Sequence, residues 1–463
     1  MIRVTCPRHL FAFPDPKEDL MSSQLPANRF SRRQFLRGMT AAGATVSIFA
    51  LAGCPAPAAP VAQTGGEAAA PAAAGGQVLF WKPPHSEREA DLWQTLLQKF
   101  MDENPGVTVD HQVIPWGSVD EQFTAAFAGG SPPDIFYLPD EWYPKYVSQG
   151  QIADLTDKIG EWRENYTEAG WTGATYKGST WGAPFLGVAQ GWVLNMNLFN
   201  EKDVAVPTNW EEFRAAAAAL TDTDAGVYGI DVPASSTNWV ILIPLLAAGG
   251  TKLLSDDLLS VTANTEGGRA AFKALLEDIV WTDQSGIPVG FTDDQRRDLR
   301  LSGNVGMSWV ETSGIKAVWR TEAPDLELET IPMLQLTDDG KNASWANIGF
   351  MFMAAQSVDN DAAFALLEYL ATDEIQVEYV QKGVDLLPLK RGIPTLPDVD
   401  PIVAEMVSWL DEGWGVGTQI SIRWREATNS LVQESHAVMS GLKTAEQALA
   451  DVEATVNPIL DGE

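Results

Sequence analysis

Cysteine is nearly absent from this sequence of 463 residues, which contains only Cys6 and Cys54. Beyond residue 54 the chain therefore has no thiol for a disulfide, a thiolate nucleophile or a cysteine-based zinc site. Histidine is also scarce, and the three histidines in that part of the chain are too scattered to indicate a metal site: His85, His111 and His436. We expect no metal ion and no other cofactor.

Positive charge is the second shortage. The chain has 31 Lys and Arg against 62 Asp and Glu, which gives a formal net charge of −31 at pH 7. Such a surface repels the phosphates of nucleic acids and anionic lipid headgroups, so we expect no nucleic-acid partner. It also disfavours an anionic ligand, unless a local cationic pocket overrides the general repulsion.

An apolar run long enough to span a bilayer is missing near the N-terminus. The uncharged stretch over residues 39–53 is too short and too rich in Gly and Thr to form a stable membrane-spanning helix. It lies between the paired-arginine sequence SRRQFL at 31–36 and the small residues LAGC at 51–54. This order is typical of an export signal.

Two parts of this segment resemble known targeting motifs. The paired arginines followed by Phe-Leu resemble a Tat signal, which a receptor reads as an address. LAGC resembles the lipobox of bacterial lipoproteins, in which the chain is cut before the cysteine and the sulfur carries a diacylglycerol. The resemblance implies an extracytoplasmic protein, at the cell surface or in the periplasm, that is anchored to the membrane through lipid on Cys54. A start at Met21 would bring the signal closer to the N-terminus. A buried Ala/Gly helix is the alternative interpretation.

The chain after the signal begins with a tether. Residues 54–76 are almost entirely Ala, Pro and Gly with one charge, Glu67, and cannot bury a core. The remaining residues exceed one typical domain and suggest two lobes.

Strands and helices alternate at the start of this body. The pattern predicts strands over 77–81, 107–114 and 135–138, with helices over 87–104 and 119–128 between them. This alternation favours a parallel sheet covered by helices, in which ligands meet the carboxyl ends of the strands. Pro184 is expected to interrupt the chain before a strand over 192–195. Further along we expect strands over 304–309 and 345–354, and helices over 238–248, 266–281, 293–302, 359–371, 373–381, 401–411, 418–440 and 444–460.

A set of short motifs then follows in a fixed order: FW at 80–81, NPG at 104–106, PDI at 133–135, GQIADLT at 150–156, KG at 177–178, WGAP at 181–184, LNMNLF at 194–199, GNVGM at 303–307, AAFALLEYLAT at 362–372, and the segment 383–388 before Arg391. In this order they resemble the family 1 extracellular solute-binding proteins, which include maltose-binding protein and serve ABC importers. The resemblance covers about residues 77–460. The family usually has Tyr-Asn-Lys where this chain has NMN at 195–197.

The resemblance implies an α/β fold of the periplasmic-binding-protein type II kind. Each of two lobes would have a β-sheet covered by helices, with residues 77–186 and 348–398 in lobe 1 and residues 187–347 and 399–463 in lobe 2. Three crossings, near 184–188, 347–349 and 397–401, would form a hinge that closes on ligand in the cleft. The ABC permease subunits would recognise the closed form.

Seventeen tryptophans favour a carbohydrate ligand. Indole faces stack on the C–H face of a sugar, while Asp, Glu, Asn and Arg pair with its hydroxyl groups. Tryptophan is also a common core residue, and Trp93, on the apolar stripe of its helix, is expected to be buried. Asp134 is expected to bond local backbone amides.

The remaining candidates are selected by their place in the chain. Trp81 and Trp116 each follow a strand, and the cluster Asp140, Glu141 and Trp142 follows the strand over 135–138. The family pattern puts further candidates in the second lobe or beside the hinge: Trp239, Glu311 and Trp345. Two more are Trp414, in a glycine-rich loop, and Arg391, which could bind ligand or form a structural ion pair.

Other functions are compatible with parts of this sequence. A secreted glycoside hydrolase needs two facing carboxylates, which 62 acidic residues can always supply. The sequence, however, lacks the G-x-S-x-G, H-E-x-x-H and P-loop signatures, and we expect no enzymatic activity. The same fold could bind a polyamine, a peptide or a glycerol phosphate, although glycerol phosphate would require clustered Arg or Lys. A surface adhesin is a weaker alternative. We predict the sugar-binding lipoprotein of an ABC importer.

Overall fold

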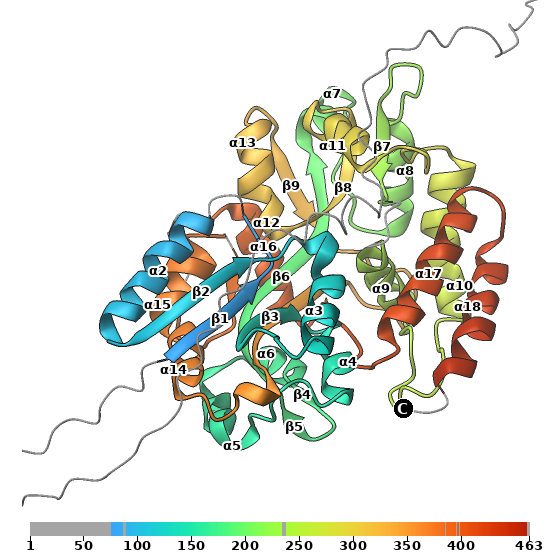
Figure 1. Ribbon diagram of the computed structural model, residues 1–463. Coiled ribbons are helices and arrows are strands. Elements are labelled where there is room, and N and C mark those ends of the chain that lie inside the picture. The colour runs from blue at the N-terminus through green and yellow to red at the C-terminus, as the bar shows by residue number, and fades with distance from the viewer. Residues whose placement is uncertain are drawn as a thin grey trace, which may run out of the picture. The chain divides into compact units, whose positions relative to one another are not determined.

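A mixed β-sheet runs through the residues that the computed structural model describes, which are 76–86, 89–233, 238–384, 386–394, 396–397 and 399–460 (Figure 1). The predicted signal, the lipid site at Cys54 and nearly all of the predicted tether lie outside these residues. The strand order is β2-β1-β3-β10-β6-β8-β7. The bounds of these strands are β1 Gly76–Lys82, β2 Val107–Val113, β3 Ile135–Pro139, β6 Gly182–Asn195, β7 Tyr228–Asp231, β8 Val305–Glu311 and β10 Ser344–Met353.

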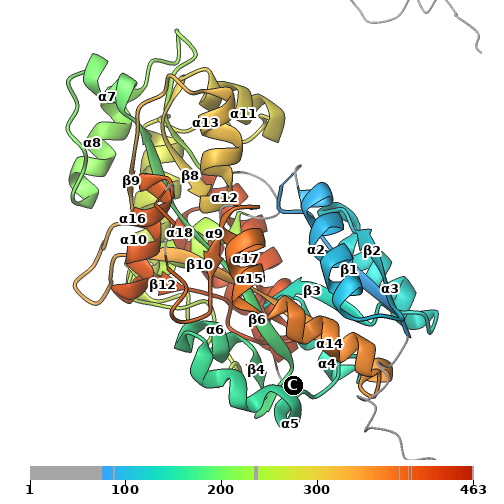
Figure 2. The same ribbon diagram turned by 90° about the vertical axis from the view of Figure 1, so that its left-hand side faces the viewer.

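The sheet is parallel where the alternation of strands and helices predicts it and antiparallel elsewhere, so it is mixed as a whole. β1 pairs in parallel with β2 and β3, as expected for strands joined by the helices between them. β10, however, lies antiparallel to both β3 and β6, and β6 lies antiparallel to β8 (Figure 2). The reason is that β6 carries the chain from the β3 side of the sheet to the β8 side, and β10 carries it back.

Pro184 does not interrupt β6, in contrast to the expectation. The register between β6 and β10 shifts at this point, since Gly349 pairs with Leu186 while Phe350 pairs with Pro184. Phe185 is therefore the extra residue of a β-bulge, a place where a strand tolerates a proline that cannot donate a ladder hydrogen bond. Short strands complete the sheets: β9 Leu328–Ile331 and β11 Leu387–Pro388 on β6, β12 Gly415–Val416 on β10, and a separate pair, β4 Thr175–Tyr176 with β5 Ser179–Thr180.

The helices form where the sequence provides amphipathic runs with start signals. Asn209 caps the helix that follows it by accepting a hydrogen bond from the Glu212 amide at 3.0 Å, and Thr292 and Gln295 form a capping box. The helices near β1–β3 are α2 Glu89–Glu103, α3 Val119–Ala128, α4 Tyr143–Ser148, α5 Thr156–Ile159, α6 Glu168–Gly173, α14 Asp361–Leu370 and α15 Asp373–Ile375, which continues as a π-helix over Gln376–Gln381. Short 3₁₀ turns lie at Trp116–Ser118, Gly160–Asn165 and Ala355–Ser357.

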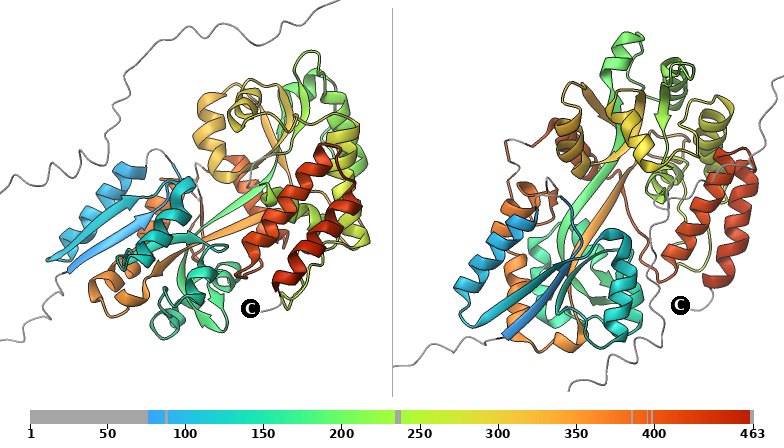
Figure 3. Two further views of the ribbon diagram at one scale, coloured as in Figure 1. Left: turned by 45° about the vertical axis from the view of Figure 1, so that its right-hand side comes forward. Right: turned by 45° about the horizontal axis from the view of Figure 1, so that its top comes forward.

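The other helices follow β6 in the chain. They are α7 Met196–Glu201, α8 Trp210–Leu220, α9 Trp239–Ala248, α10 Glu266–Phe272, which continues as a π-helix over Lys273–Thr282, α11 Asp293–Leu301, α12 Thr312–Gly314, which continues over Ile315–Trp319, α13 Arg320–Glu322, α16 Pro401–Asp411, α17 Trp424–Met439 and α18 Ala445–Leu460. The long helices α17 and α18 lie side by side (red in Figure 3). Among the described residues, no helix combines the length and the apolar character of a membrane span.

The buried apolar side chains gather around the two ends of the sheet. One group draws on β1–β3 and α2 together with α14, and includes Trp93, which is buried as predicted. The other draws on α8–α10, β8, α17 and α18. One continuous sheet connects both groups, so the sheet itself marks no boundary between lobes. The lobe boundaries and any hinge motion stay predictions.

Gly349 in β10 is a point where the fold fixes the position of a side chain from a neighbouring strand. A Cβ at this position would come within 1.8 Å of the Tyr137 hydroxyl oxygen. We expect Gly349→Ala to displace Tyr137 and to lower the free energy of unfolding by about 1–3 kcal/mol, as overpacking does. Urea unfolding measures the effect.

The matched control is Gly290→Ala, since a Cβ there would meet no heavy atom within 4 Å. This control should change the stability by less than about 0.5 kcal/mol. Equal effects at the two positions would contradict the proposed packing constraint.

Candidate ligand-binding site

The floor of the candidate site is a row of side chains across three strands. Gln190 of β6 pairs with Trp345 of β10 on one side and with Glu311 of β8 on the other. Two residues away, Asn347 pairs with Val188. Because residues two apart on a strand point to the same face, all five project from one side of the sheet. They line a cavity of about 380 Å³.

The walls come from loops and helix starts on both sides of this floor. His85, Trp116 and Glu141 follow the carboxyl ends of β1, β2 and β3, where the parallel strands were predicted to meet a ligand. Trp239 at the start of α9 and Ser313 in α12 line the opposite side. The remaining lining residues are Pro84, Tyr137, Pro139 and Val240.

The aromatic side chains of the cleft differ in how much of their surface they offer. Trp116 is 38% exposed, and its indole N–H donates to the Pro84 carbonyl at 2.6 Å, which holds the ring in place. Trp345 is only 1% exposed and packs edge to face with Trp239, with ring centroids 4.8 Å apart. The partly exposed faces for stacking are therefore those of Trp116 and Trp239.

The charged side chains of the cleft are carboxylates. Glu141 accepts from the Trp142 indole at 3.0 Å and from the Asn347 amide at 3.0 Å, while Glu311 accepts from the Ser313 hydroxyl. Among the described residues that line the cavity there is no Lys and no Arg. Ionised carboxylates only accept hydrogen bonds, so this arrangement suits a ligand that carries donors such as hydroxyl groups.

Asp140 lies beside Glu141 but is buried outside the lining. Its carboxyl group accepts from the Thr418 hydroxyl at 2.7 Å and from the Asn347 amide at 3.3 Å. Burial, followed by the charge of Glu141, raises the pKa of Asp140 well above its ordinary value. This side chain ties the segment before α17 to the end of β3.

The predicted site residues therefore divide into two sets. Trp116, Glu141, Trp239, Glu311 and Trp345 come together in the cleft, whereas Trp81, Asp140, Trp142, Arg391 and Trp414 lie outside its lining. Contact with a ligand stays a prediction for all ten.

Each residue outside the lining has a structural partner. The Trp81 ring packs edge to face with Phe123. The Arg425 guanidinium carbon lies over the Trp142 ring, 4.2 Å from the centroid of the ring.

Two more predicted residues are held by the packing around them. Arg391 donates to the Tyr166 carbonyl at 2.5 Å, and Trp414 packs against the buried cluster that contains Trp409.

Asp134 has a structural role, as predicted, but its partners are not the local amides that the sequence suggested. It accepts from the Leu79 amide at 2.8 Å and from the Ser357 hydroxyl at 2.6 Å, so it joins segments that lie far apart in the chain.

Several lining residues were not predicted from sequence, among them His85, Tyr137, Gln190, Ser313 and Asn347. Asn347 could have been found, since it lies two positions after Trp345 in a predicted strand and so shares its face. Gln190 could not, because its place depends on the register with two distant strands.

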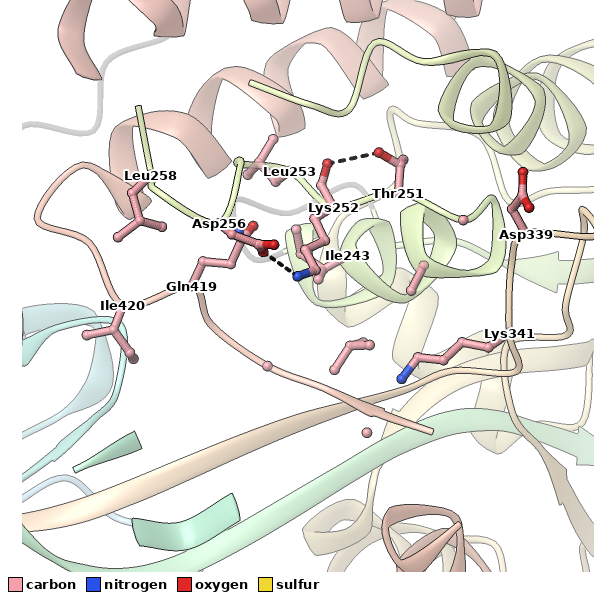
Figure 4. A pocket seen from close by; sticks show the side chains of 15 residues that line it. Ile243, Thr251, Lys252, Leu253, Asp256, Leu258, Asp339, Lys341, Gln419 and Ile420 are labelled. Atoms are coloured by element: carbon pink, nitrogen blue, oxygen red, sulfur yellow. Dashed lines mark hydrogen bonds and ion pairs between the residues drawn. The ribbon is translucent and has the colours of Figure 1, made fainter. Parts of the chain in front are cut away.

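A larger cavity, of about 640 Å³, lies elsewhere, between the end of α9 and residues 415–420 (Figure 4). Its described lining contains no aromatic side chain. Lys252 forms an ion pair with Asp256 at 2.5 Å, and Lys341 donates to the Gly413 carbonyl at 2.7 Å. The smaller cleft remains the candidate site because it alone of the two combines aromatic faces with carboxylates. Neither cavity suggests a metal site, as the described residues contain no group of three His, Cys, Asp or Glu arranged for a metal ion.

A mixed sheet with helices around both ends, and a cleft floored by the strands that link them, defines a protein that binds a solute between two parts of its fold. The chain belongs to the bacterial extracellular solute-binding protein family, whose profile it matches over residues 85–377. This confirms the predicted family.

Curated proteins and solved structures agree with this assignment. The diacetylchitobiose binding protein DasA of Streptomyces coelicolor is 26% identical over 78% of this chain and 83% of its own. The GacH receptor of Streptomyces glaucescens, solved unliganded and with acarbose, has a TM-score of 0.72 at 22% identity, over 84% of this chain and 99% of GacH. An ABC substrate-binding protein of Listeria monocytogenes in complex with cycloalternan has a TM-score of 0.71 at 20% identity, over 84% and 99% of the two chains. The predicted type II fold is confirmed.

The raised pKa of Asp140 has a measurable effect on stability. Above about pH 4, the ordinary pKa of an unfolded Asp, the Asp140 carboxyl group holds its proton more strongly in the folded protein than in the unfolded chain, so its contribution to stability falls as the pH rises. Asp140→Asn removes this dependence. Urea unfolding should therefore show the variant gaining stability relative to the wild type between pH 4 and pH 7, and a constant difference would contradict the burial of an ionisable group here.

Proposed function

We propose that this protein is the extracytoplasmic sugar-binding component of an ABC importer and holds a mono- or oligosaccharide in the cleft. The observation that carries the proposal is the combination of indole faces at Trp116 and Trp239 with acceptors at Glu141 and Glu311. A sugar presents a C–H face for the rings and hydroxyl donors for the carboxylates. The named relative that binds diacetylchitobiose and the neighbours solved with acarbose and cycloalternan support the same class of ligand.

The charge of the cleft narrows this class to neutral or cationic sugars. With two carboxylates and no Lys or Arg in the described lining, a phosphate or carboxylate on the ligand would meet repulsion. Glycerol phosphate and uronic acids are therefore disfavoured. The same two carboxylates support a polyamine as a second candidate ligand.

Capture rather than turnover is the role we assign to the cleft. We infer that the two predicted lobes close on the sugar, that the permease subunits recognise the closed form, and that the sugar is released unchanged. Export through a Tat signal and a lipid anchor on Cys54 would hold the protein beside the permease. The order of the sequence motifs supports this part of the proposal.

Sugar binding should be visible as thermal stabilisation of the protein. In a thermal-shift panel of gluco- and N-acetylglucosamine oligomers, galacturonides and spermidine, at least one neutral oligosaccharide should stabilise the protein by mass action, and the galacturonides should not. Trp116→Ala should remove the shift. Its control is Trp281→Ala, since Trp281 is 45% exposed but lies outside the cleft.

A shift with spermidine alone would favour the polyamine instead. The absence of any shift with neutral sugars, or their hydrolysis during incubation, would contradict the proposed function.

The lipid anchor on Cys54 should be visible in the distribution of the protein between membrane and soluble fractions. The wild type should fractionate with membranes and incorporate labelled fatty acid, whereas Cys54→Ser should be unlabelled and soluble. Cys6→Ser is the matched control and should behave like the wild type, since residue 6 precedes the predicted cleavage site. Labelling that survives Cys54→Ser would refute the predicted lipid site.

A further inference from the structure

A buried lysine lies directly behind the wall of the cleft. Lys82, at the end of β1, is 0% exposed. Its ammonium nitrogen lies 2.7 Å from the Pro83 carbonyl, 2.8 Å from Nδ1 of His85 and 3.2 Å from the Glu89 carboxylate. Among these partners, His85 also lines the cleft, and its imidazole ring can gain or lose a proton.

This contact determines the tautomer of His85. An ammonium group has three donors and no acceptor, so Nδ1 must accept its hydrogen bond and the ring proton must be on Nε2. A second positive charge on the ring would lie against the ammonium group. Burial, together with the charge of Lys82, accordingly lowers the pKa of His85 well below its ordinary value.

Glu89 holds the ammonium group in place. Its Oε2 atom accepts from Lys82, from the His85 backbone amide at 3.0 Å and from the Tyr379 hydroxyl at 2.7 Å. Burial lowers the pKa of Lys82 to about 8, and the charge and hydrogen bond of Glu89 oppose the shift. Lys82 therefore keeps its proton at neutral pH.

Two aromatic rings of the cleft wall fix the orientation of the imidazole. The imidazole packs edge to face with both rings, and its centroid lies 5.5 Å from that of Trp116 and 5.0 Å from that of Tyr137. Because Nδ1 is turned to the buried Lys82, the edge of His85 that a ligand can reach carries the Nε2–H group.

We propose that His85 is a ligand-binding residue of the cleft, a neutral Nε2–H donor to an oxygen atom of the sugar, and that Lys82 and Glu89 are its positioning residues. This inference rests on the proposed function. The His85 donor would complement Glu141 and Glu311, whose carboxylates only accept hydrogen bonds. Hydroxyl groups of the sugar would donate to the carboxylates, and a ring, hydroxyl or amide oxygen of the sugar would accept from His85.

A consequence is that the donor does not titrate at mildly acidic pH. The titratable groups around Lys82 and His85 are Glu89 on α2, His111 on β2, Tyr137 on β3 and Tyr379 in the π-helical segment, with Glu141 and Glu311 facing the same cavity. Burial and the charge of Lys82 together keep the His85 ring neutral.

The first experiment examines the ring without a ligand. Long-range ¹⁵N–¹H correlation spectra of the full-length protein should show His85 as the Nε2–H tautomer and unchanged between about pH 5 and pH 7.5. In Lys82→Met the pKa of the same ring should rise, because the charge of Lys82 is removed while burial still opposes protonation. Titration of His85 in the wild type within this range, or an Nδ1–H tautomer, would overturn the inference, and the wild-type spectra decide it even if the variant does not fold.

The second experiment measures affinity by calorimetry with whichever gluco- or N-acetylglucosamine oligomer gives the largest thermal shift. His85→Phe should weaken binding about tenfold, as expected for loss of a hydrogen bond in a desolvated site. His85→Gln, which places an amide donor near the Nε2 position, should recover part of the loss. Unchanged affinity in a folded His85→Phe variant would refute the role of His85 while leaving sugar binding intact, whereas a wild type that binds no oligomer would refute the proposed function together with this inference.

Discussion

The antiparallel pairing of β6 and β10 is the constraint on which the site depends. These two strands are the ones that link the two groups of buried side chains, and their register decides which residues form the floor of the cleft. With Gln190 between Trp345 and Glu311, an aromatic ring, an amide and a carboxylate lie in one row. A shift of one residue would turn this row to the other face of the sheet. The bulge at Phe185 absorbs the irregularity outside the row.

The hydrogen-bonding partners around the cleft leave its polar groups with defined roles. The side-chain oxygen Oε1 of Gln190 accepts from the Trp309 indole at 2.9 Å, which leaves the side-chain N–H groups of Gln190 for a ligand. Glu141 and Glu311 supply acceptors, and His85 supplies a donor whose proton is fixed from behind by Lys82. A site with preset donors and acceptors reorganises little when it binds, which favours selective capture of a hydroxyl-rich molecule.

Local sequence patterns predicted most of the elements, because amphipathic periodicity and caps are short-range signals. The helix over Val119–Ala128 agrees with its predicted range. The predicted helix over 418–440 begins only at Trp424. Before it, the Gln419 side chain bonds both the amide and the carbonyl of Leu254, at 2.9 and 2.7 Å, which ties this non-helical segment to a distant part of the chain. Residues whose roles depend on distant partners were equally hidden: neither the guanidinium of Arg425 over Trp142 nor the register at Gln190 is encoded near them in the chain.

The measurement that tests the central claim most directly is a crystal structure of the protein with a bound neutral oligosaccharide. The account predicts a sugar ring against the exposed face of Trp116, with hydroxyl groups within hydrogen-bond distance of Glu311 and Gln190 in the floor of the cleft. An oligosaccharide bound in the cavity beside Lys252 and Lys341, with the cleft empty, would contradict it.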